Sequence, residues 1–328
     1  MKQVRRVMIG AIALVSVQCS DASAPESMEP IISPSGRIAF VTEVSPGNGA
    51  LYIANSDGSG LRLLHSGPTW YMRPRWSPDR RRIVFSRMDT DGGTGIYVID
   101  VDGQEGLVRL ANGRDPAWSP DGSKIVFTAR VAPQSFEFGI HVMNADGSNI
   151  RRLTSPNDRA QCTVGSSAND LIPDWSPDGQ KIVFERDIHL DDNGGFDCGL
   201  DGYGYVPNVY VMNSDGTGVQ RLRSVAWWSG DREPAWSPDG RSIAYGEHGG
   251  DDIFIIDKDG AFPAQRVIFA TSVAALAPTW SPDGKKLLVL GAAPPSNKLF
   301  ILDIEAGTAQ YVNLPPVPGL LLDPAWSR

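Results

Sequence analysis

The stretch Pro116-Ala117-Trp118-Ser119-Pro120-Asp121-Gly122, followed by the apolar run Ile125-Val126-Phe127, decides the fold of this chain. Near copies of it are centred on Ile32, Trp76, Trp175, Trp236 and Trp280, and a truncated copy begins at Trp326. Successive centres lie 44, 42, 57, 61, 44 and 46 residues apart. A repeat of about 40–45 residues that carries four strands is the period of a β-propeller blade. We therefore predict an all-β, six-bladed propeller with four antiparallel strands per blade.

Each repeat divides into four short strands joined by recognisable turns. The Pro-x-Trp segment is the first strand, and Ser-Pro-Asp-Gly fits a type I turn, with Pro at its second position. The second and third strands are β-branched and aromatic runs such as Ile83-Val84-Phe85 and Ile96-Tyr97-Val98-Ile99. An Asp-Gly pair such as Asp146-Gly147 then predicts the hairpin to the fourth strand, because Gly tolerates positive φ.

The chain offers one first strand more than a ring of six blades requires. Pro324-Ala325-Trp326 comes after the last complete repeat, while Pro30-Ile31-Ile32 is a weaker candidate at the start. We predict that the C-terminal strand pairs into the first blade and closes the circle, which protects the sheet edges that an open array would expose.

The tandem pattern Trp-Ser-Pro-Asp-Gly-x-x-Ile-x-Phe resembles the WD40-like repeat (PD40) of the TolB propeller family. The resemblance covers about nine-tenths of the chain and implies the propeller fold. TolB itself places an α/β domain before its propeller, whereas only about 30 residues precede the repeats here, so a Tol–Pal role is not implied. The same repeat precedes a hydrolase domain in prolyl-oligopeptidase-type peptidases, and no such domain follows here.

The first 19 residues have the pattern of a targeting segment. Lys2, Arg5 and Arg6 precede an apolar stretch, Val7 to Val17, that is too short to span a bilayer. Cys19 follows and resembles the lipidated cysteine of a bacterial lipoprotein, although Gln18 stands where a small residue is expected. The alternative is a secretory signal cleaved near Ala22-Ser23-Ala24. Both interpretations predict export to the periplasm or an outer-membrane anchor, with residues 20–29 as a flexible tether and 30–328 as the propeller.

The net charge limits the classes of partner, and the cysteine content indicates the compartment. The net charge of -8 argues against nucleic acid, whose phosphates would be repelled. Beyond Cys19 there remain Cys162 and Cys198, an even pair for an oxidising compartment. They lie in the two insertions that lengthen the repeat, Ser155 to Ile172 and Asp187 to Pro207. We predict a Cys162–Cys198 disulfide that pins both loops; two free thiols are the alternative.

Antiparallel strand order sorts the loops into two ends of the propeller. The uniform Ser-Pro-Asp-Gly and Asp-Gly turns occupy one end, named here the turn face, and all length variation falls on the other, the variable face. The predicted binding rim on the variable face consists of aromatic residues: Trp70, Tyr71, Phe136, Phe138, Tyr203, Tyr205, Trp227 and Trp228. Packing of these rings within their own loops is the alternative. The repeat tryptophans, by contrast, are expected to pack between blades.

Metal binding and catalysis have weaker support in the sequence. Asp191, Asp192 and Asp197 are candidate calcium ligands in an acidic loop, for which a solvated surface is the alternative. No Gly-x-Ser-x-Gly or His-Glu-x-x-His motif is present, so no catalytic residue is predicted. We expect a monomeric, non-enzymatic module without cofactor that binds a protein or peptide in the cell envelope. The alternative is a metal-dependent polysaccharide lyase or hydrolase, because fold alone does not fix function.

Overall fold

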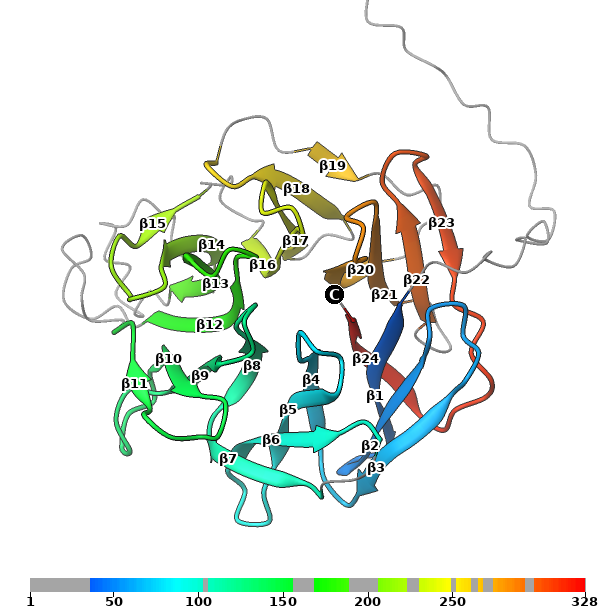
Figure 1. Cartoon of the computed structure of the whole chain (residues 1–328), viewed down its shortest axis with the longest axis horizontal. Coiled ribbons are helices and arrows are strands. Elements are labelled where there is room, and N and C mark those ends of the chain that lie inside the picture. The colour runs from blue at the N-terminus through cyan, green and yellow to red at the C-terminus, as the bar shows by residue number, and fades with distance from the viewer. Residues whose placement is uncertain are drawn as a thin grey trace, which may run out of the picture.

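Six four-stranded sheets surround a central axis in the computed structural model, which describes residues 36–102, 106–155, 168–188, 206–222, 230–248, 252–260, 265–267, 274–292 and 298–327. Figure 1 looks down this axis and shows the sheets as the blades of a ring. Every regular element in these ranges is a strand. The predicted six-bladed, all-β propeller is therefore confirmed. The described ranges include no helix that is long and apolar enough to cross a bilayer.

Each blade is an antiparallel meander that begins at the axis and runs outward. Blade 1 consists of β24 (Leu320–Trp326), β1 (Arg37–Ser45), β2 (Asn48–Asn55) and β3 (Arg62–Gly67). Blade 2 consists of β4 (Tyr71–Trp76), β5 (Arg82–Met88), β6 (Thr94–Asp100) and β7 (Val108–Asn112). Blade 3 consists of β8 (Arg114–Trp118), β9 (Lys124–Arg130), β10 (Phe138–Asn144) and β11 (Arg151–Arg152).

The remaining blades follow the same order. Blade 4 consists of β12 (Ala168–Trp175), β13 (Lys181–Ile188), β14 (Val206–Asn213) and β15 (Gln220–Arg221). Blade 5 consists of β16 (Gly230–Trp236), β17 (Ser242–His248), β18 (Ile253–Asp257) and β19 (Gln265–Val267). Blade 6 consists of β20 (Ala274–Trp280), β21 (Lys286–Ala292), β22 (Lys298–Asp303) and β23 (Thr308–Tyr311).

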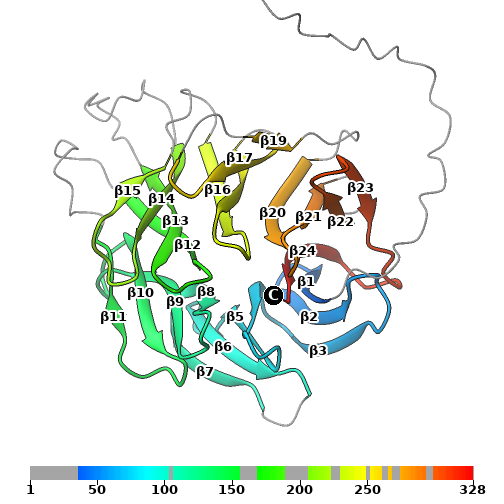
Figure 2. The same ribbon diagram turned by 45° about the horizontal axis from the view of Figure 1, so that its top comes forward.

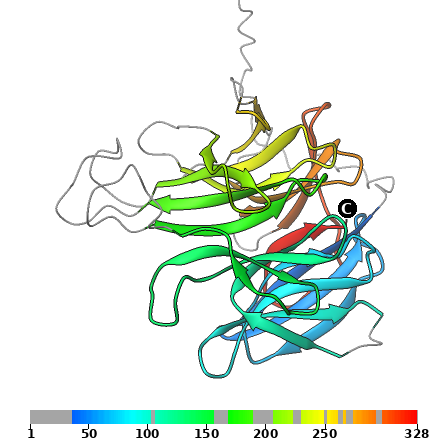
Figure 3. The ribbon, with the colours of Figure 1, turned by 60° about the vertical axis from the view of Figure 1, so that its left-hand side comes forward.

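The C-terminal strand closes the ring as predicted. β24 pairs with β1, with Ile38 opposite Trp326, so strands from both ends of the propeller share blade 1. Figure 2 shows β24 beside β1, and Figure 3 shows the blades from the side. Pro30-Ile31-Ile32, the competing candidate, lies outside the described residues.

The hydrophobic core is divided among the spaces between neighbouring blades. Each repeat tryptophan packs against the blade before its own: Trp236 of blade 5, for example, lies among Val183, Val209 and Val211 of blade 4. The repeat tryptophans Trp76, Trp118, Trp175, Trp236, Trp280 and Trp326 are all buried. Their predicted role in packing between blades is confirmed, and it explains why the motif must recur in every blade.

The turns between the first and second strands of blades 2 to 6 share one hydrogen-bond pattern. In blade 3 the amide of Gly122 donates to the carbonyl of Ser119 at 2.9 Å, as a type I turn requires. The Ser119 hydroxyl donates to Asp121 at 2.6 Å, and this bond, with further bonds from Ser123, lowers the pKa of Asp121 to about 2. The turn face is therefore a rigid, repeated surface.

Candidate functional site

The innermost strand of every blade is bent at one equivalent position. The residue before the motif proline has a left-handed backbone, and φ lies between 43° and 56° at Arg73, Asp115, Ile172, Glu233, Ala277 and Asp323. A β-bulge interrupts the pairing of each innermost strand at this point. A left-handed conformation is costly for non-glycine residues, and proline further restricts the residue before it. Because the bend recurs at the equivalent position of every blade, it belongs to the architecture of the repeat, and it places these six residues around the propeller axis, in the space named here the channel.

The amides at these bulges are bound by the preceding blade. The amide of Asp115 donates to the Ser86 hydroxyl at 2.9 Å, and the amide of Glu233 donates to the Glu185 carboxyl group at 3.0 Å. At Arg73 the acceptor is instead the carboxylate of Asp323, at 3.0 Å. At these three bulges, side chains of one blade thus fix the backbone of the next.

Arg73 spans the channel at the level of this ring. Its guanidinium forms an ion pair with Glu233 of blade 5 and lies 3.9 Å from Asp115 and 3.7 Å from Asp323. Burial opposes the charge of Arg73, but the three carboxylates outweigh it and raise its pKa. Burial likewise opposes the charge of Glu233, yet Arg73 holds the pKa of that carboxyl below its ordinary value. One cation therefore joins four blades across the axis.

Glu185 stands beside this network in a different protonation state. Its side chain is buried, and burial together with the nearby charges of Asp187 and Glu233 raises its pKa to about 8. A protonated carboxyl group still accepts the Glu233 amide through its carbonyl oxygen. At neutral pH Glu185 is thus a neutral support of the channel wall.

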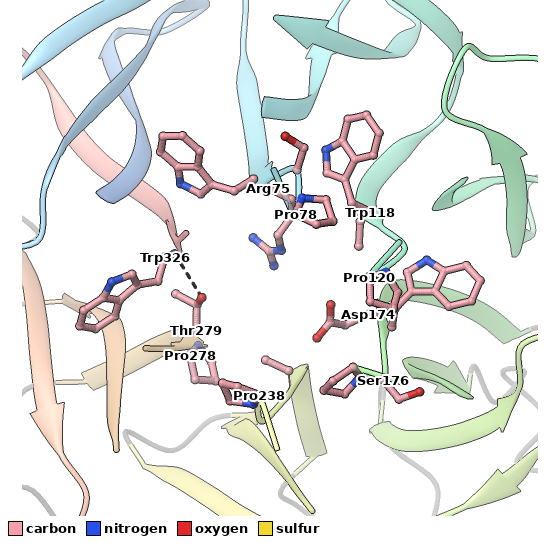
Figure 4. Close-up of a pocket in the computed structure, with 16 residues that line it drawn as sticks. Arg75, Pro78, Trp118, Pro120, Asp174, Ser176, Pro238, Pro278, Thr279 and Trp326 are labelled. Carbon is pink, nitrogen blue, oxygen red and sulfur yellow. Dashed lines mark hydrogen bonds between the residues drawn. The ribbon is translucent and has the colours of Figure 1, made fainter. Parts of the chain in front are cut away.

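A cavity of about 320 Å³ opens from the channel toward the turn face. All six blades contribute to it, mainly through tryptophans and the prolines of the repeat: Trp76, Pro78, Trp118, Pro120, Trp175, Pro177, Pro238, Pro278 and Trp326. Arg75 and Asp174 are the charged residues among those that line it, and Figure 4 shows both side chains directed toward its centre. We refer to this cavity as the funnel. It combines apolar walls with a few polar groups, as ligand pockets generally do.

The predicted aromatic rim has several different environments. Phe136 is 87% exposed, Trp70 and Phe138 are half-buried, and Tyr71 is only 2% exposed. The ring of Tyr71 stacks on Phe85 at 5.8 Å and its hydroxyl lies 2.7 Å from His65 Nδ1. Placing Tyr71 on an exposed rim was wrong, because its strand position directs it into the core between blades 1 and 2.

Many of the other sequence predictions fall outside the described residues: Tyr203, Tyr205, Trp227, Trp228, Asp191, Asp192, Asp197, Cys162, Cys198 and Cys19. They stay predictions. Within the described ranges, no group of three or more His, Cys, Asp or Glu side chains is placed to hold a metal ion.

Sequence reasoning overlooked the channel residues and the funnel. Reading the position before the motif proline in all six repeats would have given a signal, because Arg73 is a single cation among Asp115, Glu233 and Asp323. Differences in loop length point to the variable face. The funnel lies instead on the turn face.

Comparison with known proteins finds relatives among the TolB-like propellers. The TolB beta propeller domain model, PD40, matches residues 32–189. An uncharacterized protein of Agrobacterium fabrum is 31% identical over 222 residues, which are 65% of this chain and 67% of the relative. A protein TolB homolog of Chlorobium luteolum is 36% identical over 202 residues, 61% of this chain but 38% of the homolog. The crystal structure of TolB from Acinetobacter baumannii shares the fold, with a TM-score of 0.67 and 23% identity over 89% of this chain and 67% of that one.

Proposed function

Because the chain belongs to the TolB-like family of PD40 β-propellers, we propose that it is an exported, non-enzymatic module that binds a protein or peptide in the bacterial cell envelope. The funnel is the observation that carries this proposal. Its walls, which expose mainly the prolines of the repeat, suit an apolar side chain, and Arg75 and Asp174 suit polar groups of a peptide that enters along the axis.

A preorganised funnel supports tight binding of a partner. Strands of six blades and the ion pairs of Arg73 hold its walls, so a partner loses little free energy in ordering the site. A volume of about 320 Å³ accommodates a few side chains, and the surrounding turn face offers further contact area for a folded partner.

The test is a pull-down from envelope extract with the tagged full chain and a funnel variant. Pro120→Glu together with Pro238→Glu places carboxylates at the mouth, and the second position of a type I turn accepts most residues. The matched control is Val108→Glu together with Tyr311→Glu, which adds equal charge at exposed positions on the outermost strands β7 and β23. A partner retained by the wild type and the control but lost by the funnel variant supports the proposal. Retention by the funnel variant would refute the funnel as the site.

Metal analysis of the same purified samples addresses the alternative function. A stoichiometric divalent ion that survives dialysis, together with cleavage of an acidic polysaccharide, would favour the lyase or hydrolase. Absence of any captured partner combined with such activity would replace the binding proposal.

A further inference from the structure

A second surface lies on the variable face of blade 3, at the loop of residues 131–137 between β9 and β10. Its centre is Phe136, whose side chain is 87% exposed. The guanidinium carbon of Arg130 lies 5.8 Å from the centroid of Phe136 and 5.4 Å from that of Phe138. The guanidinium carbon of Arg114 lies 4.3 Å from the Phe138 centroid. These four residues, named here the arginine–phenylalanine patch, form a continuous series of cation–π contacts.

The loop that presents Phe136 is held in place by hydrogen bonds at several points. The amide of Val131 donates to the carbonyl of Glu137, and the amide of Ser135 to that of Ala132, both at 3.0 Å. Arg130 donates to the carbonyl of Ser135, and Arg152 donates to that of Val131 at 3.2 Å. Because the loop is already ordered, exposing a phenylalanine on it presents a contact surface at little further entropic cost on binding.

Adjacent blade 4 fixes the base of the loop. The amide of Phe138 donates to Asn169 Oδ1 at 2.9 Å, so the first residue of β10 is tied to the neighbouring innermost strand β12. The patch, which is built from blade 3, is therefore anchored to blade 4, and its position does not depend on the loop alone.

Arginines outnumber carboxylates at the patch, with Arg114, Arg130 and Arg152 against Asp115 and Glu137, on a protein whose net charge is -8. Among the described ion pairs, Arg130 and Arg152 join no carboxylate, while Arg114 lies 3.5 Å from Asp115, which it shares with Arg73. The hydrogen bonds of Arg130 and Arg152 to loop carbonyls use only part of the donor set of each guanidinium. The remaining donors favour an anionic ligand.

We propose that the patch, together with Arg152, binds an acidic segment of the protein partner in which a carboxylate stands next to an apolar side chain. The carboxylate would pair with Arg130 or Arg152, and the apolar side chain would cover Phe136. The exposed Phe136 offers an apolar surface for an aliphatic or aromatic side chain, which a peptide carries and an acidic polysaccharide lacks. The patch chemistry therefore fits an acidic peptide better than an acidic polysaccharide. This inference rests on the proposed binding function and names a second contact site for it.

The experiment pans a random 12-residue peptide display library against the immobilised full chain and measures enriched peptides by fluorescence polarisation. The patch variants are Arg130→Glu and Phe136→Ala. Lys124→Glu is the matched charge control, since Lys124 lies at the opposite end of the same strand, β9. Ile150→Ala is the matched apolar control, because Ile150 is also exposed, at 53%.

We expect enriched peptides in which Asp or Glu lies within two residues of an aromatic or aliphatic residue. Arg130→Glu should weaken their binding by about tenfold or more and Phe136→Ala by about fivefold, with both controls unchanged. Peptides without acidic residues, or peptides that both patch variants still bind, would overturn the inference. So would retention of polygalacturonate that is lost in Arg130→Glu, since the ligand would then be a polysaccharide. Peptides lost only with the Pro120→Glu, Pro238→Glu variant would refute the patch and leave the proposed function standing.

Discussion

Arg73 of β4 and Glu233 of β16 form an ion pair across the central channel, although 160 residues separate them in the sequence. The pair joins blades 2 and 5, and the neighbouring Asp115 and Asp323 extend the contact to blades 3 and 1. Both partners occupy the left-handed position before the motif proline. The same bulge that bends every innermost strand thus brings these side chains together at the axis.

Removing the cation should destabilise the whole ring. Arg73→Met leaves three carboxylates without their shared partner, and breaking a buried pair in this way costs about 3–5 kcal/mol. Urea unfolding at pH 7 measures the loss. The double variant Arg73→Met, Glu233→Gln should recover part of it, because one unpaired charge is removed; an Arg73→Met protein as stable as the wild type would contradict this role.

The loss of unfolding free energy caused by Arg73→Met should be smaller at acidic pH. Arg73 depresses the pKa of Glu233 in the folded protein, so the stabilisation is present at neutral pH and is lost as pH falls through that folded pKa. Unfolding free energies of wild type and variant should therefore converge toward pH 3. A constant difference between pH 7 and pH 3 would show that packing, and not charge, accounts for the effect.

Glu185 should give the opposite pH dependence. Its pKa is raised to about 8 in the folded state, so between its ordinary value and pH 8 the unfolded chain releases a proton that the folded chain keeps. Stability from this group falls as pH rises through that window. Glu185→Gln keeps an acceptor for the Glu233 amide and should gain at least about 1 kcal/mol over the wild type between pH 5 and pH 8. Equal pH profiles from chemical denaturation would contradict the assignment.

The turn of blade 2 contains a non-glycine residue at a position where four other turns have glycine. Arg80 has φ of 59°, whereas Gly122, Gly179, Gly240 and Gly284 adopt 68° to 70° at the equivalent place. Arg80→Gly should stabilise the protein by about 0.5–1 kcal/mol, because the strain of a left-handed arginine exceeds the entropy that glycine adds to the unfolded chain. Its carbonyl contact with Arg37 is kept. Thermal unfolding measures the change, and Gly122→Ala, which should lower stability, is the reciprocal control.

Loss of the closing strand should open the ring and cause the protein to self-associate. Deleting residues 319–328 removes β24 and leaves the edge of β1 unpaired, and exposed edges pair with other chains. Sedimentation velocity should show larger species and thermal unfolding should become less cooperative. Trp118→Ala is the comparison: it empties a core position without exposing an edge, so it should lower stability by about 3–5 kcal/mol without association. A truncated protein of unchanged size and stability would argue against ring closure by β24.

The sequence allowed the ring to be predicted because each blade repeats local signals. Trp118 with its Ser-Pro-Asp-Gly turn specifies strand, turn and packing within a few residues, and the pairing of Ile38 with Trp326 follows from counting strands. The order of loops on the two faces follows from the same antiparallel order.

The site could not be predicted in the same way, since it arises from contacts across the closed ring. Arg73 and Glu233 belong to different repeats and differ in residue type, so a search for conserved spacing passes over them. The funnel exists only where six innermost strands converge. The sequence did not show that Tyr71 belongs to the core, because an aromatic residue at the end of a loop looks the same as one at the start of a buried strand. The structure shows that Tyr71 is the first residue of β4.

The central claim, a protein partner bound at the funnel, is tested most directly by site-specific photo-crosslinking in intact bacterial cells that produce the protein. The crosslinking residue p-benzoylphenylalanine replaces Pro120, which is exposed and lines the funnel, or Val108, which is exposed on the outermost strand β7. We predict a discrete protein adduct from position 120 and none from position 108. Adducts from position 108 alone, or no adduct from position 120 in a protein that remains folded, would contradict the account.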